Sequence, residues 1–287
     1  MTSFIWNTLS QDEAVASLAT SDRVAHKKRI AAYERALETS TANSDYFRKT
    51  TLTVAEEETL SLPPLEAMPG ITVIEICVKP HASLQIPYLH TNASASMTIM
   101  RITLEEGASV DLFAGIFGGT SSSLIVETTL AGAHSSTHQR TVFFGDEAQN
   151  FDIFSNTTLT GESTTAMIEQ KGVLLNRAQA RFDGNIIIKN TAHKADAKLL
   201  EHTLLLSSEA RVNAIPGLTI ETNDVRASHA ASVTRIDDEQ LFYCKSRGIE
   251  EREGIALITE GFLKTIYANT PFEKNLDQLI EEKLCRI

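Results

Sequence analysis

The chain has 287 residues and a formal net charge of −11, so it has no basic excess with which to neutralise nucleic-acid phosphates or anionic lipid head groups. No apolar run approaches the ~18 residues that cross a bilayer, and the first residues lack the basic start and apolar run of a secretory signal. We therefore expect a cytoplasmic protein without a nucleic-acid or membrane partner.

Residues 10–38 are predicted to form a helix. Ser10 and Glu13 fit a capping box at its start. Apolar residues then recur at helical spacing, namely Val24, Ile30, Tyr33 and Leu37. We place an N-terminal helical segment at residues 1–45.

From about residue 50 the sequence changes to short runs rich in Val, Ile, Thr and Phe. Examples are residues 71–78, 97–104 and 141–144. Such runs are typical of β-strands. A β-rich core is therefore predicted over residues 46–235.

Small residues recur within this core at intervals of 15, 15, 15, 17 and 15, at Ala133, Ala148, Ser163, Ala178, Ala195 and Ala210. Each unit has room for two short strands and two turns but cannot bury its own apolar face, so neighbouring units must stack. This favours a solenoid. A β-sandwich remains open on spacing alone, because its short strands also follow one another at regular intervals.

Residues 236–287 are predicted to form a C-terminal helical domain. Asp237 can cap a first helix that ends at Gly248. A second helix would bury the stripe Ile255, Ile258, Phe262 and Ile266, and a third the stripe Leu276, Leu279, Ile280 and Leu284. Helical segments at both ends of the core would cover the open ends of a solenoid.

The most specific pattern lies within residues 223–249. Ser228 and His229 come first, then Arg235-Ile-Asp-Asp-Glu-Gln-Leu-Phe-Tyr243, then Ser246-Arg-Gly-Ile249. In this order the pattern resembles the signature of the SufB/SufD family, the scaffold proteins of the SUF machinery for iron-sulfur cluster assembly. The resemblance covers about residues 185–265 and implies a mainly β fold with a right-handed parallel β-helix core capped by helical segments.

The same resemblance implies that His229 is a metal ligand for a transient iron-sulfur cluster at a subunit interface. A neutral imidazole binds iron well, but one histidine cannot hold a cluster, so the other ligands must come from another chain. The resemblance implies no catalytic residue and no cofactor that the isolated chain retains.

Departures from the family pattern point to a SufD-like member. A SufB-type protein would have a cysteine about nine residues before the histidine and a carboxylate just after it, where this chain has Ile220 and Ala230. SufD-type proteins often have a cysteine two residues before the histidine and a glycine after it, where this chain has Ala227 and Ala230. The thiolate of a cluster-building scaffold is thus missing.

The implied function is that of a non-enzymatic scaffold subunit. It would pair with a SufB-like subunit or with itself, and residues 236–287 would dock a SufC-type ABC ATPase. One alternative is a homodimeric scaffold with both SufB and SufD duties, in which Cys77 or Cys244 supplies the thiolate. Another is a β-helix carbohydrate-active enzyme, which needs clustered charged residues on one solenoid face.

The remaining histidines and cysteines are weaker candidates. His134 and His138 are four residues apart, His81 and His90 flank a proline-containing stretch predicted as a loop, and His193 and His202 straddle one repeat. We expect all six to be exposed or bonded locally. The cysteines Cys77, Cys244 and Cys285 are isolated and odd in number, which predicts no disulfide framework, and Cys77 is expected to pack as a small apolar residue.

Overall fold

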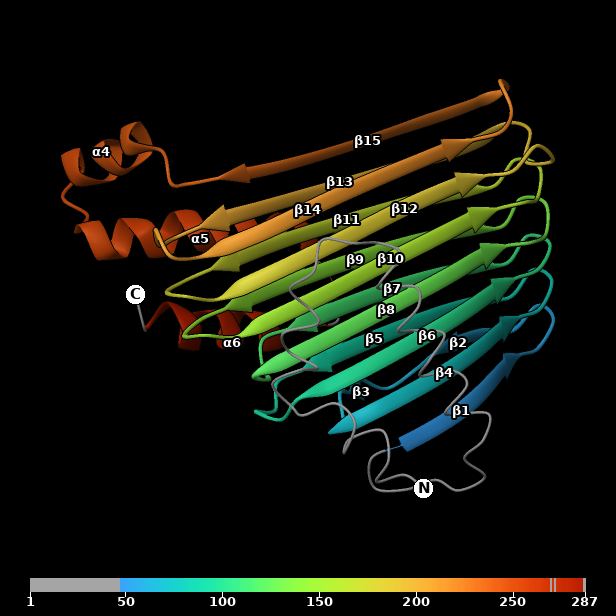
Figure 1. Cartoon of the computed structure of the whole chain (residues 1–287), viewed down its shortest axis with the longest axis horizontal. Coiled ribbons are helices and arrows are strands. Elements are labelled where there is room, and N and C mark those ends of the chain that lie inside the picture. The colour runs from blue at the N-terminus through green and yellow to red at the C-terminus, as the bar shows by residue number, and fades with distance from the viewer. Residues whose placement is uncertain (1–46, 269, 271, 286–287) are drawn as a thin grey trace, which may run out of the picture.

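The computed structural model describes residues 47–268, 270 and 272–285. Most of this part forms two parallel β-sheets that face each other (Figure 1). Sheet A contains β1 (Phe47–Val54), β4 (Gly70–Val78), β6 (Ser96–Leu104), β8 (Ser121–Leu130), β10 (Asn150–Leu159), β12 (Gln179–Ile188) and β14 (Arg211–Ile220), paired in that order. Sheet B contains β2 (Thr59–Ser61), β5 (Ser83–His90), β7 (Ser109–Ile116), β9 (Ser136–Gly145), β11 (Thr165–Leu174), β13 (Ala195–Leu205) and β15 (Val225–Thr234), with β3 (Leu65–Glu66) beside β5.

The chain alternates between the two sheets, and each strand pairs with the strand one coil later in the same sheet. Every described strand pairing is parallel. This confirms the predicted parallel β-helix and rules out the β-sandwich, whose sheets are antiparallel. The helix predicted at residues 10–38 lies outside the described residues.

Each full coil is longer than the predicted repeat, and the number of residues in a coil increases along the solenoid. Phe47 pairs with Ile71 in the first coil of sheet A, and Gln179 pairs with Arg211 in the last. The interval between the recurring small residues therefore corresponds to one strand and one turn, not to two of each. The physical reason is strand length. A strand such as β8 or β10 has 10 residues, so one strand and one turn already make up half a coil.

The turns that lead into sheet B form a ladder along one edge. In each of six successive turns, a residue with φ between 56° and 62° donates its backbone N–H to a carbonyl of the next coil. These donors are Glu57, His81, Gly107, His134, Ser163 and Lys194. In five of these turns the following residue is small and fully buried, namely Ala82, Ala108, Ser135, Thr164 and Ala195. On this edge the predicted small-residue repeat is thus correct for Ala195. Ala133 lies two residues before the buried Ser135, and Ser163 lies one residue before the buried Thr164.

The main core lies between the sheets and is built from the alternate, inward-facing residues of each strand. Close approach inside it requires a glycine at one place. Phe143 and Gly172 are neighbours in sheet B, and a Cβ added to Gly172 would lie 1.8 Å from Cζ of Phe143. The aromatic ring of one coil therefore occupies the side-chain space of the next.

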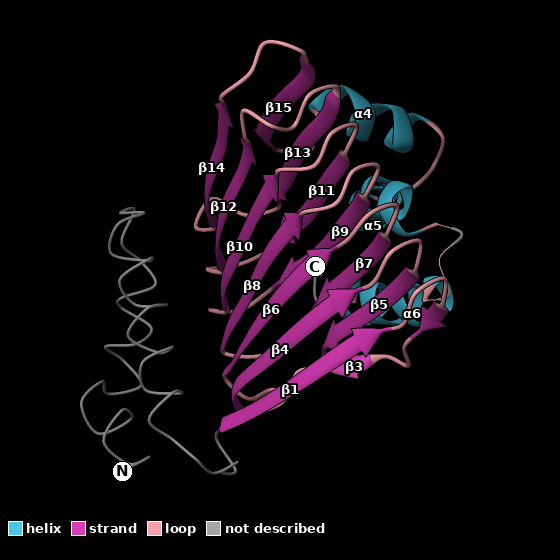
Figure 2. Ribbon diagram, turned by 90° about the vertical axis from the view of Figure 1, so that its right-hand side faces the viewer, coloured by secondary structure: helices cyan, strands magenta, loops and turns pink. Residues whose placement is uncertain are grey.

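Three helices follow the solenoid: α4 (Asp238–Ser246), α5 (Glu251–Tyr267) and α6 (Glu273–Leu284). Figure 2 shows α5 and α6 against the outer face of sheet B, where they bury apolar side chains of both layers. None of the helices in the described part of the chain is long and apolar enough to cross a bilayer.

The C-terminal helices form where they were predicted, but the prediction that they cover the open end of the solenoid is wrong, because α5 and α6 pack on the outer face of sheet B and, within the described part of the chain, leave the edges of β14 and β15 open. The Asp237 carboxylate accepts a 2.9 Å hydrogen bond from the Glu239 N–H, and Gly248 has a φ of 80° just after α4. The buried face of α6 is the predicted one, since Leu276, Ile280 and Leu284 are buried. The stripe predicted for α5 is wrong in part, because the fully enclosed residues are Thr259, Leu263, Ile266 and Tyr267, with Ile255, Ile258 and Phe262 at the margin.

Candidate functional site

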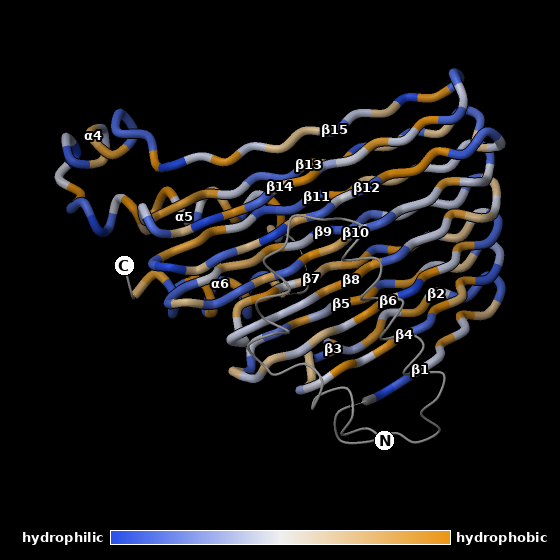
Figure 3. Tube along the Cα trace, in the orientation of Figure 1, coloured by the Kyte–Doolittle hydropathy of each residue, from blue (hydrophilic) through white to orange (hydrophobic). Residues whose placement is uncertain are grey.

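The last coil of the solenoid, β14 and β15, has no further coil above it. Each of these strands is at the edge of its sheet (Figure 1), so one side of its backbone has no strand partner within the described residues. Ile220 at the end of β14 and Val233 on β15 are 45% and 47% exposed. Apolar and polar residues both occur along this edge (Figure 3). The edge is therefore open to pairing with another chain.

His229 lies in the middle of β15 and is exposed. Its register partner is Leu199 of β13. Residues that pair across a parallel sheet share a face, so the His229 side chain continues an inward-facing column that contains Ile86, Leu112, Gln139, Ile168 and Leu199. His229 is exposed because the column ends there. Its imidazole forms no hydrogen bond or ion pair with the rest of the described chain.

Ile220, the last residue of β14, also faces inward, from the other sheet. Its register partner is the fully buried Ile188, so it also continues an inward-facing column. Ala227 lies on the same side of β15 as His229, whereas Ala230 faces outward. The last coil thus offers one imidazole and no thiolate or carboxylate beside it. Within the described residues no group of three potential metal ligands occurs.

A buried carboxyl group lies one coil below His229. Glu201 is on the inner face of β13, two residues from Leu199, and is fully buried. Thr203 donates a hydrogen bond to its Oε1, while Oε2 has no hydrogen-bond partner among the described residues. Burial raises the pKa of this carboxyl, because a charge is poorly solvated there.

Gln170 pairs with Glu201 across sheet B and is also buried. Neither atom of its amide group has a partner among the described residues. An unsatisfied buried polar group is costly and uncommon. Neither residue was predicted from the sequence. Glu201 has the same parity along its strand as the apolar Ala195, Ala197 and Leu199, which is the signal that could have identified it.

The other histidines are held locally or exposed, as expected. Nε2 of His138 is hydrogen-bonded to Oε2 of Glu169 at 2.9 Å, and Nδ1 of His202 to Oγ of Ser232 at 2.6 Å. His90 is buried beside Ser96, and burial lowers its pKa. The stretch from His81 to His90 is mostly strand β5, so the loop predicted there is wrong. The alternating residues of this segment form a strand, and its proline does not interrupt it. His134 and His193 lie in exposed turns.

The three cysteines are free. Cys77 is on β4, half-buried, with Sγ 3.7 Å from a Glu105 carboxylate oxygen, so it does not pack as a purely apolar residue. Cys244 is buried in α4, and Cys285 is exposed after α6. None of them lies on the last coil.

The helical unit presents a second exposed surface, which we call the α4 surface: Phe242 and Tyr243 of α4 with Leu257 of α5. These side chains are 73%, 59% and 55% exposed. Exposed large apolar residues on adjoining helices are a feature of protein-binding sites. The aromatic pair belongs to the pattern found in the sequence, but its exposure could not be predicted from it.

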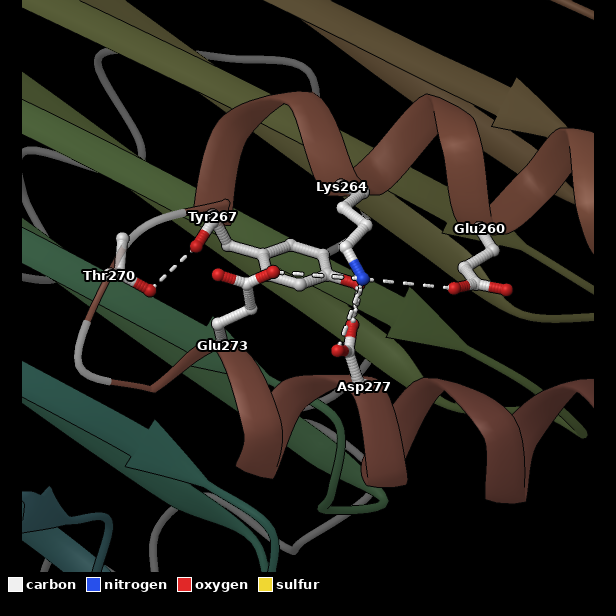
Figure 4. Close-up of polar contacts among 6 residues, drawn as sticks. All are labelled: Glu260, Lys264, Tyr267, Thr270, Glu273 and Asp277. Atoms are coloured by element: carbon white, nitrogen blue, oxygen red, sulfur yellow. Dashed lines mark hydrogen bonds and ion pairs between the residues drawn. The ribbon is translucent and has the colours of Figure 1, made fainter.

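A polar cluster joins α5 to α6 (Figure 4). Lys264 lies 3.2 Å from both carboxylate oxygens of Asp277, and the Tyr267 hydroxyl donates to Asp277 at 2.8 Å. The bond to Asp277 raises the pKa of Lys264. Thr270 donates to the Tyr267 carbonyl at 2.7 Å, which closes the turn between the helices. The two helices therefore form one rigid unit.

Residues 49–262 match the model of the family described as SUF system FeS cluster assembly, SufBD core domain. The chain belongs to the SufB/SufD family. The matched range includes the whole last coil, α4 and most of α5, so both exposed surfaces lie within the family's core domain.

Several SufB/SufD relatives are similar over parts of their length. The iron-sulfur cluster assembly protein SufD of Bacillus subtilis is 36% identical over 156 residues, which is 53% of this chain and 35% of that protein. A SufBD family protein of Mycobacterium leprae is 27% identical over 213 residues, 73% of this chain and 24% of that protein. A SufBD family protein of Pyrococcus horikoshii is 25% identical over 223 residues, 71% of this chain and 50% of that protein. The chain thus spans a quarter to a half of these relatives' length.

Proposed function

We propose that this protein is a non-enzymatic, SufD-like scaffold subunit for iron-sulfur cluster assembly in the cytoplasm. The observation that carries the proposal is the arrangement of the last coil, where His229 continues the inner column at an open strand edge. Membership of the SufB/SufD family supports the general role, and the similarity to a SufD protein supports the SufD-like assignment.

The open edge would pair with a SufB-like subunit or with a second copy of this chain. Strand addition would satisfy the backbone groups of β14 and β15 and would cover the exposed Ile220 and Val233. His229 would then lie inside the joint core and contribute one ligand to a transient iron-sulfur cluster. Thiolates of the partner would contribute the others.

A homodimer that builds clusters without a separate SufB-like subunit is the weaker version of this proposal. It would need a thiolate near His229. Cys77 lies on β4, separated from β14 by four strands of sheet A, and Cys244 is buried in α4. The place of the expected cysteine is taken by Ile220.

The α4 surface would dock a SufC-type ABC ATPase. Exposed aromatic side chains are frequent anchors of protein interfaces, and Phe242 and Tyr243 are more than half exposed. Because α5 packs directly on β9 and β11, a force applied to the helices would reach the solenoid.

Co-expression with a SufB-like subunit and a SufC-type ATPase tests the proposal. We expect the three chains to co-elute in size-exclusion chromatography, and His229→Ala to lower the yield of reconstituted cluster without dissociating the complex. His134→Asn is the control, since His134 is an exposed histidine in the turn between β8 and β9, in an earlier coil, and asparagine tolerates its φ of 59°. Failure to co-elute, or an equal loss of cluster in both variants, would contradict the proposal.

A further inference from the structure

Strand β15 is held by backbone hydrogen bonds on one side only, by β13. Edge strands open more readily than internal ones, since half of their backbone groups face no ladder. His229 lies on β15, three residues before Ser232. Contacts that fix the outer face of β15 therefore also determine how firmly His229 is held.

Ser232 is fixed to β13 by His202. The two residues are register partners, and Nδ1 of His202 lies 2.6 Å from Oγ of Ser232. Burial lowers the pKa of His202, and the positive charge of Lys171 lowers it further. The neutral imidazole is therefore favoured, and its Nδ1 can accept a hydrogen bond from the Ser232 hydroxyl group.

Lys171 connects this pair to helix α5. It is the register partner of His202 on β11. Its ammonium donates to the Phe262 carbonyl at 3.0 Å and to the Thr265 hydroxyl at 2.6 Å, and lies 4.6 Å from the centre of the Phe262 ring. Lys171 forms no ion pair within the described residues, so α5 provides the hydrogen-bond partners of its ammonium group.

We propose that Lys171 and His202 are positioning residues that couple helix α5 to edge strand β15. Phe262 and Thr265 bind the ammonium group of Lys171, and His202 is hydrogen-bonded to Ser232. Lys171, His202 and Ser232 are register neighbours in one outer column of three adjacent strands, where the charge of Lys171 favours the neutral form of His202. The consequence for His229 as a cluster ligand rests on the proposed function. The coupling itself belongs to the isolated chain and can be measured without partners.

Hydrogen–deuterium exchange of the purified full chain tests the coupling. We expect Lys171→Met to speed exchange in β15 by about three- to tenfold, as for the loss of a modest local stabilisation, and to leave β4 unchanged. Lys198→Met is the matched control, because Lys198 is an exposed lysine on the same outer face of β13 and has no bond to α5. That variant is expected to leave β15 unchanged.

Thr265→Val removes one acceptor on α5 without altering the solenoid, and should also speed exchange in β15. It keeps the test valid if Lys171→Met does not fold. The double variant Lys171→Met with Ser232→Ala should exchange no faster than the faster single variant, because both changes break one chain of contacts.

Unchanged β15 exchange in both Lys171→Met and Thr265→Val would overturn the coupling. Equal acceleration in β4, or additive effects in the double variant, would do the same. Loss of co-elution with a SufB-like subunit or an ATPase would instead contradict the proposed function, so the two failures are distinguishable.

Discussion

Lys283 of α6 forms a buried ion pair with Asp146 in the turn between β9 and β10, with Nζ 2.6 Å from Oδ1 and the side chains 10% and 2% exposed. The same ammonium donates to Gln149 at 3.0 Å. A residue near the end of the chain is thereby bonded to the middle of the solenoid. The last helix is held by this charge pair as well as by its apolar face.

Lys283→Met is expected to lower the free energy of unfolding by about 3 to 5 kcal/mol, because it removes one partner of a buried ion pair. Urea denaturation followed by circular dichroism measures the change. Lys274→Met on the exposed face of α6 is expected to change stability by less than about 0.5 kcal/mol. Equal effects of the two substitutions would show that the ion pair does not hold α6.

Glu201→Gln is expected to change how stability depends on pH. Burial raises the pKa of Glu201 in the folded protein, so the folded state favours the neutral form. The wild type should therefore lose stability as the pH rises from the ordinary carboxyl pKa of about 4.3 to the raised folded-state value. The variant cannot ionise at this position and should lack that loss.

The measurement is the denaturation midpoint of both proteins from pH 4 to pH 8. The exposed Glu209→Gln serves as the control and should follow the wild type. Parallel curves for wild type and Glu201→Gln would mean that the carboxyl group ionises without cost in the folded state.

Gly172→Ala should destabilise the solenoid by about 1 to 3 kcal/mol or more, as overpacking of a core does, since the new methyl group would meet Phe143. Phe143→Leu in the same chain should recover part of the loss. Gly261→Ala has open space around its Cβ within α5 and should stabilise the protein by up to about 1 kcal/mol. Thermal unfolding of the four proteins compares them, and an unaffected Gly172→Ala variant would contradict the packing.

Phe242→Ser should weaken binding of a SufC-type ATPase by at least about tenfold, as expected for a central aromatic anchor. The isolated chain should keep its stability to within about 0.5 kcal/mol, because this side chain is 73% exposed. Calorimetric titration gives the affinity. Gln240→Ala, also exposed on α4, should bind like the wild type. Unchanged affinity in Phe242→Ser would place the docking surface elsewhere.

Residue periodicity predicted the strands and α6 because these elements bury one face along their whole length. It failed for the coil, since the regular recurrence of a small residue does not reveal how many strands lie between two of them. It was wrong in part for α5, where Ile266 is buried as predicted but the buried face is set by sheet B and centres on Leu263 and Tyr267.

The site was only partly predictable. The resemblance to the SufB/SufD signature singled out His229 as a candidate ligand, but its inward register follows from the pairing with Leu199. The contact of Lys171 with Phe262 joins residues far apart in the sequence. Such a contact depends on how the helix docks on the sheet, which no local pattern contains.

The coil that joins Phe47 to Ile71 is shorter than the one that joins Gln179 to Arg211. The two ends of the described solenoid therefore differ in circumference. Two copies that met through their last coils would match in width, whereas a last coil placed on a first coil would not. Head-to-tail addition is the geometry that leads to open filaments, while matched ends give a closed pair. Within the described residues, the widening of the coil would therefore make two last coils a better geometric match for each other than a last coil and the coil of β1.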